Sequence, residues 1–212
     1  MRHQAPELVV KQTEVKKKEV KAMEQKANSF TVKVPEKAYV KGFSDGSFKP
    51  DQVVSRAEAA QILGQFIQAD QAYRLAKDVD ANAWYAKNMA KLYGLSIFSG
   101  TEDGSLRPQA GMSRAELSVL ISRILKLKPD NARFNDVAPG VWYNGYVGAV
   151  QGAGIIQGYP DGSFGADRTV TRAELVVIVN RAFHVADKSG RIQFKDLPAS
   201  HWAYKEIQKA AN

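Results

Sequence analysis

The sequence predicts a mainly α-helical fold, in which three tandem helix-loop-helix repeats form a pseudo-threefold bundle that follows a charged N-terminal segment. Two observations predict it. A glycine recurs every 58 residues, and an arginine follows each glycine by fourteen positions. The glycines are Gly42, Gly100 and Gly158, and the arginines are Arg56, Arg114 and Arg172. Because one unit of this length cannot bury a core alone, the copies are expected to stack on one another.

Each copy has two halves, and the two kinds of half are out of phase with the ends of the chain. The first half is a glycine-rich turn followed by a helix, and the second half is a helix marked by Trp84, Trp142 or Trp202. No tryptophan half precedes Gly42, whereas a third one ends the chain at residues 194–211. We therefore expect the C-terminal helix to complete three pairs in a closed arrangement.

This phasing divides the chain into five segments. They are a charged linker or helix at 1–30, a first repeat (turn plus capped helix) at 31–75, a second repeat at 76–128, a third repeat at 129–188, and the completing tryptophan helix at 189–212. In the first segment lysines alternate with glutamates, which favours a solvated helix or linker. A basic arm that contacts a polyanion is the alternative.

The composition is that of a soluble globular protein whose partner is acidic. The chain has 212 residues, of which 44% are hydrophobic and 25% are charged. Its net charge of +8 and pI near 9.5 favour an acidic polymer as partner. Nucleic acid fits that charge too, but no recognition motif is present, so no nucleic-acid partner is expected.

Several site classes are excluded by what the sequence lacks. There are no cysteines, and the three histidines match no metal-ligand spacing, so neither a metal nor a cofactor is expected. No apolar run approaches the roughly 20 residues that span a bilayer, so no membrane insertion is expected. The N-terminus also lacks an apolar secretion segment, so an exported form of this protein would be a processed or truncated chain.

The helix of each first half has a start signal and one apolar stripe. The start signals are capping boxes, with a hydroxyl at the cap and a glutamate three residues on, worth about 1 to 2 kcal/mol. Their members are Ser55 and Glu58, Ser113 and Glu116, and Thr171 and Glu174. The stripes are Ala59, Ile62, Leu63, Phe66 and Ile67; Leu117, Leu120, Ile121, Ile124 and Leu125; and Leu175, Ile178, Val179, Ala182 and Phe183. We expect these helices to face a shared interior.

The arginine inside each capping box has two interpretations. A positive residue at a helix start is disfavoured by the helix dipole, so capping does not explain it. In one interpretation the arginine ties adjacent repeats together by bonding carbonyls or an aspartate. In the other, its guanidinium and the free amides of the helix start present a site for an anion.

The Asp-Gly pairs at 45, 103 and 161 indicate tight turns, because calcium-loop and phosphate-loop patterns are missing.

The motifs together resemble those of the S-layer homology domain. They are Gly158-Tyr-Pro-Asp-Gly-Ser-Phe164, then Thr171-Arg-Ala-Glu174, with Phe134-x-Asp136-Val137 and Trp142 upstream. The resemblance covers about residues 38–212 and includes all three copies. It implies a pseudo-trimeric helical body whose grooves between repeats hold a secondary cell-wall polysaccharide, commonly one that bears pyruvate ketals.

The resemblance implies a function without catalysis, outside the cell. The protein would anchor a fused or attached surface protein to an acidic polysaccharide in the cell wall or S-layer. Residue by residue, Arg56, Arg114 and Arg172 would meet the anionic ketal, Trp84, Trp142 and Trp202 would pack on a sugar face, and Gly42, Gly100 and Gly158 would let backbone approach the ligand. Burial of the tryptophans as the first members of helix stripes is an equal alternative.

Two other functions stay open, and the copies depart from the family pattern. The alternatives are a peptidoglycan-binding anchor of an outer-membrane protein and a structural oligomerisation module; a glycan hydrolase is disfavoured because no catalytic motif is present.

Copy two has Thr101-Glu102 where the family favours an aromatic residue and proline, and Glu102 would oppose an anionic ligand. Copy three has Gly165-Ala166 in place of a basic residue and proline. We therefore expect unequal grooves, of which one or two bind well.

Overall fold

A computed structural model describes residues 29–70, 73–188 and 190–212 of this chain. Within those ranges it contains six helices and one sheet of two strands, which confirms the predicted mainly helical fold. The elements are β1 (Thr31–Val32), α2 (Arg56–Gly64), β2 (Ile67–Gln68), α3 (Ala86–Gly94), α4 (Arg114–Ile124), α5 (Asn144–Gly152), α6 (Arg172–Phe183) and α7 (Tyr204–Ala211). The proposed linker, helix or basic arm in 1–30 lies almost wholly outside the described residues.

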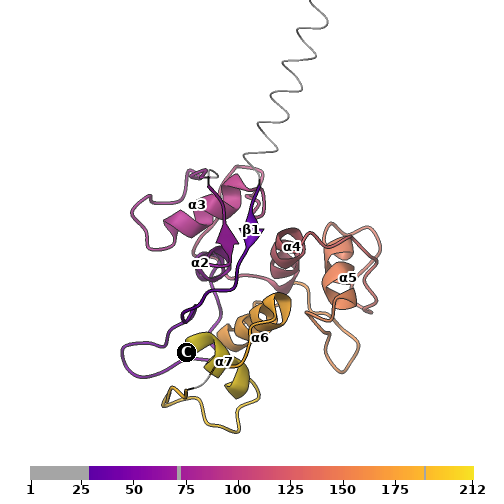
Figure 1. Ribbon diagram of the computed structural model, residues 1–212. Coiled ribbons are helices and arrows are strands. Elements are labelled where there is room, and N and C mark those ends of the chain that lie inside the picture. Colours follow the sequence, from indigo (N-terminus) through magenta and orange to yellow (C-terminus); the bar gives the residue numbers. More distant parts are fainter. Residues whose placement is uncertain (1–28, 71–72, 189) are drawn as a thin grey trace, which may run out of the picture.

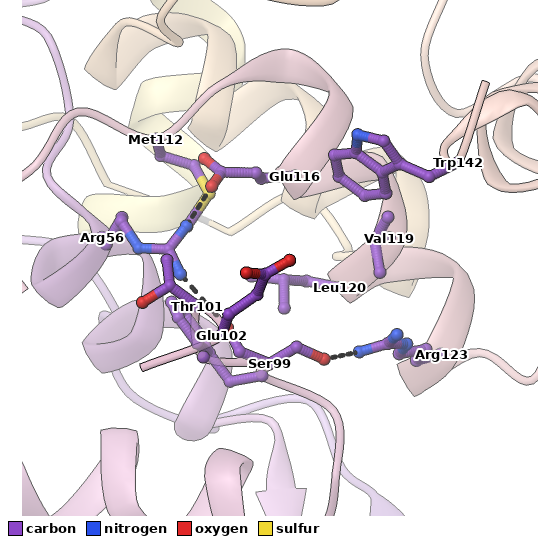
Figure 2. Close-up of a pocket in the computed structure, with 12 residues that line it drawn as sticks. Arg56, Ser99, Thr101, Glu102, Met112, Glu116, Val119, Leu120, Arg123 and Trp142 are labelled. Carbon is purple, nitrogen blue, oxygen red and sulfur yellow. Dashed lines mark hydrogen bonds and ion pairs between the residues drawn. The ribbon is translucent and has the colours of Figure 1, made fainter. Parts of the chain in front are cut away.

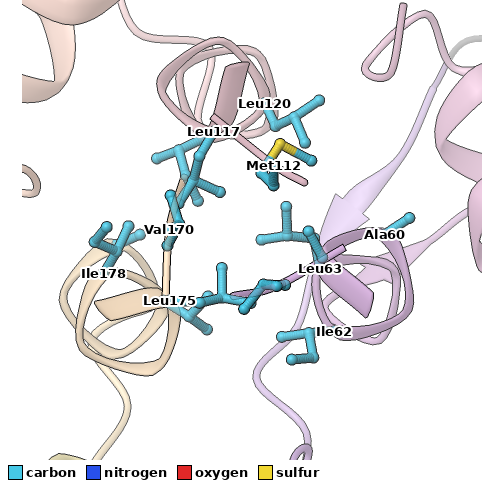
Figure 3. Close-up of a cluster of buried hydrophobic side chains, with 14 of the residues drawn as sticks. Ala60, Ile62, Leu63, Met112, Leu117, Leu120, Val170, Leu175 and Ile178 are labelled. Atoms are coloured by element: carbon cyan, nitrogen blue, oxygen red, sulfur yellow. The ribbon is translucent and has the colours of Figure 1, made fainter. Parts of the chain in front are cut away.

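The six helices form three pairs around a common centre. Helix α2 packs on α3, α4 on α5 and α6 on α7. The three capped helices lie inside, and the three helices that follow the tryptophans lie farther out (Figure 1). Figure 3 shows α2, α4 and α6 surrounding one apolar cluster, to which Leu63, Leu117 and Leu175 each contribute a fully buried side chain. The shared interior is therefore built by the predicted stripes.

A ring of three backbone hydrogen bonds joins the repeats at this centre. The ring residues Val54, Met112 and Val170 each directly precede a helix cap. Val54 N–H donates to the Val170 carbonyl, Met112 N–H to the Val54 carbonyl and Val170 N–H to the Met112 carbonyl, each at 2.9 Å. Because each copy donates to one neighbour and accepts from the other, the ring closes only when all three copies are present.

The helix starts carry the predicted capping boxes and make a second set of bonds between repeats. In all three, the cap hydroxyl accepts from the glutamate N–H and the glutamate carboxylate accepts from the cap N–H. The next two amides are also occupied: Arg114 N–H donates to the Arg168 carbonyl and Ala115 N–H to the Ala166 carbonyl, both at 3.0 Å. The other two helix starts make equivalent bonds. The prediction that free helix-start amides help to hold an anion is therefore wrong.

The C-terminal half-repeat contacts the turn of the first copy. The Asp196 carboxylate accepts hydrogen bonds from Phe48 N–H at 2.8 Å and Lys49 N–H at 2.7 Å, and the Phe194 ring lies 5.3 Å from that of Phe48. Asp78 and Asp136 accept the same pair of bonds in the turns of copies two and three. Burial acts to raise the pKa of Asp196, but these two amides hold its pKa below the usual value. The last half-repeat thus packs on the first turn.

The predicted stripe after Ser55 is longer than the helix that it forms. Helix α2 ends at Gly64, so Phe66 lies beyond the helix and Ile67 belongs to β2, although both side chains are buried. The Lys91 amine donates to the Gly64 carbonyl at 2.5 Å and to the Ile67 carbonyl at 2.9 Å. A lysine from α3 therefore satisfies the last carbonyl of α2 and the first carbonyl of β2, and so bridges the end of the helix and the start of the strand.

Removing the Asp196 carboxylate should test whether the C-terminal half-repeat closes the ring of copies by binding the first turn. Asp196→Ala leaves two backbone amides without a charged acceptor, so we expect the free energy of unfolding in urea to fall by about 1 to 2 kcal/mol. Asp78→Ala and Asp136→Ala should lower the free energy of unfolding by similar amounts. The matched control is Asp51→Ala, because this aspartate is exposed and lies two residues after Lys49. An Asp196→Ala protein as stable as the control would contradict closure by the C-terminal half.

Candidate functional site

Among the residues that the structure describes, three cavities lie where one repeat meets the next, and the largest of these three lies beside α4. It has a volume of about 510 Å³ and combines Arg56 at the start of α2, the segment 98–102, one face of α4 that includes Glu116, and Trp142. Figure 2 shows Arg56 and Trp142 on opposite sides of this cavity, with Glu102 between them. We call it the Arg56 groove.

The other two cavities are built from equivalent residues of the other copies. The Arg114 groove, of about 140 Å³, is lined by Arg114, Glu174, Arg181 and Trp202 among others. The Arg172 groove, of about 170 Å³, is lined by Arg172, Glu58 and Trp84 among others. Each groove thus joins the arginine of one copy to the cap glutamate of the next copy and to the tryptophan half that follows it. The structure brings together the arginines and tryptophans that the sequence predicts.

The three arginines are buried at the boundaries between copies. Arg56 is 7% exposed, Arg114 5% and Arg172 8%. Arg56 Nε donates to the Leu106 carbonyl at 2.7 Å, its Nη2 donates to the Ser99 carbonyl at 3.3 Å, and its Nη1 pairs with Glu116. All three partners belong to the next copy, so the guanidinium ties the two copies together.

Arg114 and Arg172 repeat this arrangement around the ring. Arg114 donates to the Phe164 and Gln157 carbonyls, and Arg172 to the Phe48 and Lys41 carbonyls, at 2.9 to 3.0 Å. Their carboxylate partners are Glu174 at 3.9 Å and Glu58 at 3.6 Å. The interpretation that the arginines tie adjacent repeats is therefore confirmed, with a glutamate in place of the aspartate. Since a guanidinium has five N–H donors, it retains donors after bonding two carbonyls and one carboxylate.

The cap glutamates have a second role that the sequence did not reveal. Glu58, Glu116 and Glu174 each bind the cap amide of their own helix and also face the arginine of the preceding copy. One carboxylate therefore joins a helix start to the boundary between copies. Capping explained these glutamates fully, so the sequence offered no reason to seek another partner.

The tryptophans are exposed, and the alternative that they are buried in helix stripes is wrong. Trp84, Trp142 and Trp202 are 63%, 65% and 63% exposed, and each lies two residues before its helix begins. Trp84 and Trp142 stand edge-on against the ring of the following tyrosine, with centroids 5.3 and 5.2 Å apart. An exposed indole at the mouth of a groove presents an apolar face that can contact a sugar.

The glycines are explained by close contacts within the fold. A Cβ on Gly42 would overlap the Phe194 ring and lie 2.8 Å from the Ser47 carbonyl oxygen. A Cβ on Gly158 would likewise overlap the Phe134 ring, whereas Gly100 has only its own turn close by, with the Ser105 carbonyl oxygen at 3.0 Å. Gly100 also lines the Arg56 groove. A ligand-facing role for the three glycines stays a prediction.

A second arginine lines two of the grooves and was not predicted. Arg123 extends from α4 into the Arg56 groove, where its Nη1 donates to Ser99 Oγ at 2.5 Å and to the Ile97 carbonyl at 3.1 Å. Arg181 occupies the equivalent place in the Arg114 groove, whereas copy one has Gln65 at the corresponding position in the chain. The 58-residue spacing of the two arginines was visible in the sequence and could have revealed them.

The Asp-Gly segments are tight turns, as predicted. Asp45, Asp103 and Asp161 each accept hydrogen bonds from the hydroxyl and backbone N–H of the serine two residues later. These bonds, led by the serine hydroxyl, hold the pKa of all three carboxyls below the usual value.

Nowhere in the described ranges do three or more metal-ligating side chains cluster, and no helix there is long and apolar enough to cross a bilayer.

Comparison with known proteins finds one family and several large relatives. The family model described as "S-layer homology domain" matches residues 36–60, 77–118 and 133–176, which make up more than half of the chain. The chain is 29% identical to cell surface glycoprotein 1 of Acetivibrio thermocellus over 82% of its length, and 30% identical to the cellulosome-anchoring protein of that organism over 80%. It is 29% identical to S-layer protein EA1 of Bacillus anthracis over 73%.

The chain matches only part of each of these relatives. It covers 8% of the surface glycoprotein, 41% of the cellulosome-anchoring protein and 18% of the S-layer protein. The chain therefore spans less than half the length of each.

Stability measurements should separate the arginines from the tryptophans. Arg114→Met leaves Glu174 and two carbonyls without their partner at a buried boundary, so we expect the free energy of unfolding to fall by about 3 kcal/mol. Trp142→Ala removes a largely exposed side chain and should cost less than about 1 kcal/mol. Chemical denaturation followed by circular dichroism measures both. Equal stability of Arg114→Met and the unsubstituted protein would refute the assignment of the arginine as a tie between copies.

Proposed function

This chain belongs to the S-layer homology domain family, and we propose that it is a non-catalytic module that anchors a surface protein to the cell wall. Its ligand is an acidic secondary cell-wall polysaccharide that bears pyruvate ketals, held in the grooves between copies. The observation that carries the proposal is the juxtaposition of a buried arginine and an exposed tryptophan in every groove.

The two side chains suit the two kinds of surface on such a ligand. A guanidinium with unused N–H donors, placed in a partly buried groove, binds a carboxylate through charge-assisted hydrogen bonds. An exposed indole offers an apolar face to the C–H groups of a sugar ring. Because the arginine and tryptophan come from different copies, the site exists only in the closed body. The net charge of +8 further favours an acidic polymer.

The absence of catalysis is supported by how the cap glutamates in the grooves are used. Glycoside hydrolysis needs one carboxyl group as acid and a second as base or nucleophile. Glu58, Glu116 and Glu174 are each bound to a cap amide and paired with a buried arginine, which leaves them poorly placed for either task.

The attached cargo is inferred from the relatives. Their names describe a cell surface glycoprotein, a cellulosome-anchoring protein and an S-layer protein, and each is much longer than the matched region. We therefore place this chain outside the cell, as the part that binds the wall in a larger surface protein.

Sedimentation with purified wall sacculi tests the proposal. The protein should pellet with sacculi that retain their ketals, and mild acid removal of the ketals should abolish most of the pelleted fraction, because the arginines lose their carboxylate partner. Pelleting that is unchanged after ketal removal would eliminate the pyruvate ketal as the recognised group. Failure to pellet with any wall preparation would eliminate wall anchoring.

The charge of Glu102 should limit the affinity of the Arg56 groove. This exposed carboxylate lines the groove, so Glu102→Gln should strengthen binding of the ketal-bearing polysaccharide by about two- to fivefold at low salt, and less at high salt. Glu36→Gln, which changes the net charge equally at a residue outside the groove lining, should bind like the unsubstituted protein. Titration calorimetry at two salt concentrations measures the difference, and an equal gain in both variants would assign the effect to net charge alone.

A further inference from the structure

Each groove contains a second cation besides the buried arginine at its boundary. These second cations are Arg123 in the Arg56 groove, Arg181 in the Arg114 groove and Lys41 in the Arg172 groove. Arg181 and Lys41 are exposed, and Arg123 is half-buried. Each second cation therefore meets solvent in its groove, whereas the boundary arginine is almost fully buried.

The boundary arginines have their charge balanced by a carboxylate, and the second cations do not. The balanced pairs are Arg56 with Glu116, Arg114 with Glu174 and Arg172 with Glu58. In the part of the chain that the structure describes, no ion pair includes any of the three second cations. An anion that enters a groove therefore finds the uncompensated positive charge on the second cation.

Arg123 is held in place by only one of its terminal nitrogens. Its Nη1 donates to Ser99 Oγ at 2.5 Å (Figure 2) and to the Ile97 carbonyl at 3.1 Å, and its guanidinium carbon lies 5.5 Å from the centroid of the Tyr146 ring. Among the described residues, Nε and Nη2 donate to no protein group. Two such neighbouring N–H groups can bind a carboxylate through parallel hydrogen bonds. Arg123 is thus fixed in orientation and keeps a free edge for a carboxylate.

Copy one keeps the backbone bond of this arginine without its charge. Gln65 occupies the position of Arg123 in copy one, and its Nε2 donates to the Tyr39 carbonyl at 2.9 Å. Tyr39 in turn occupies the position of Ile97, whose carbonyl binds Arg123. A glutamine therefore makes the same structural bond at this position, so the fold does not require an arginine there.

Lys41 supplies the missing charge from a different position. It stands in copy one where Ser99 stands in copy two and Gln157 in copy three, and all three backbone carbonyls accept a hydrogen bond from the boundary arginine. Lys41 also lines the Arg172 groove. The second charge is therefore present in every groove, although the position that supplies it differs, which indicates that the groove requires the charge itself.

The Arg56 groove shows what the second cation contributes. Its charged lining residues are Arg56, Glu116, Glu102 and Arg123. Arg56 and Glu116 balance each other, so Arg123 offsets the exposed Glu102 carboxylate. Without Arg123 the lining would carry a net negative charge and repel an acidic ligand.

We propose that the second cation of each groove binds the anionic group of the wall glycan. The boundary arginine is chiefly a tie between copies and adds its spare N–H donors, whereas Arg123, Arg181 and Lys41 supply the positive charge. This inference rests on the proposed function. Because arginine binds a carboxylate through two parallel bonds and lysine acts as a point charge, the Arg172 groove should have a weaker hold on this group than an arginine would give it.

Removal of the charge from one groove at a time tests the inference. The probe is soluble polysaccharide released from ketal-bearing sacculi, and the indole N–H resonance of the tryptophan in each groove reports the local affinity. Arg123→Gln should weaken the binding reported by Trp142 at least about tenfold and leave that reported by Trp202 within about twofold. Arg181→Gln should have the reverse effect. Arg191→Gln, at an exposed arginine outside the three groove linings, is the control for net charge.

Two further variants separate charge from structure. Arg123→Lys retains the charge, so it should weaken the binding reported by Trp142 less than about fivefold. Adding Ser99→Lys to Arg123→Gln reproduces the lysine and glutamine of copy one and should restore most of the lost affinity. Because copy one already holds a glutamine at this position, the thermal midpoint of Arg123→Gln should stay close to that of Arg191→Gln.

Each outcome has a defined consequence. Arg123→Gln that binds as tightly as Arg191→Gln would overturn the inference. So would a loss in Arg123→Lys as large as that in Arg123→Gln, or a double variant as weak as Arg123→Gln alone. If none of the three indoles of the unsubstituted protein responds to the polysaccharide, the proposed function itself is overturned, which distinguishes the two failures.

Discussion

Every copy of this repeat leaves its helix start to be satisfied by the next copy, and the rest of the structure depends on that constraint. The arginine and alanine amides of each capped helix bond to carbonyls of the following turn, and the arginine side chain bonds to two more. Because buried backbone groups without partners are costly, an open chain of copies would leave one set of donors unpaired. Three copies in a closed ring satisfy all of them, and the C-terminal half-repeat provides the aspartate that holds the first turn.

The grooves are a consequence of the same interlock. Each arginine lies at a boundary because its partners belong to the next copy, and each tryptophan stands at the mouth of a groove because it precedes an outer helix. The cap glutamate that faces the arginine limits how many guanidinium donors remain for a ligand. Differences among the grooves therefore arise at positions outside the interlock, such as Glu102 in the Arg56 groove. A nearly threefold scaffold can in this way support one site that differs from the other two.

The sequence predicted the scaffold better than the site, for physical reasons. Repetition and capping are local signals, so the helices, the turns and the closure by residues 194–211 could be predicted from spacing alone. Hydrogen-bond partners across a boundary are not local, which is why the occupied helix-start amides and the second role of Glu116 were missed. Apolar periodicity could not distinguish a tryptophan inside a stripe from one just before it, and Trp142 proved to be exposed.

The three indole N–H groups provide a direct test of the central claim, that the boundaries between copies form the glycan site. In a protein labelled with ¹⁵N, Trp84, Trp142 and Trp202 each give one indole resonance at the mouth of one groove. We predict that titration with ketal-bearing polysaccharide fragments shifts at least one of the three indole resonances, and most strongly that of Trp142, which lines the largest of the three grooves. Binding that shifts none of the three indoles would contradict the claim, because the glycan would then be held away from the boundaries between copies.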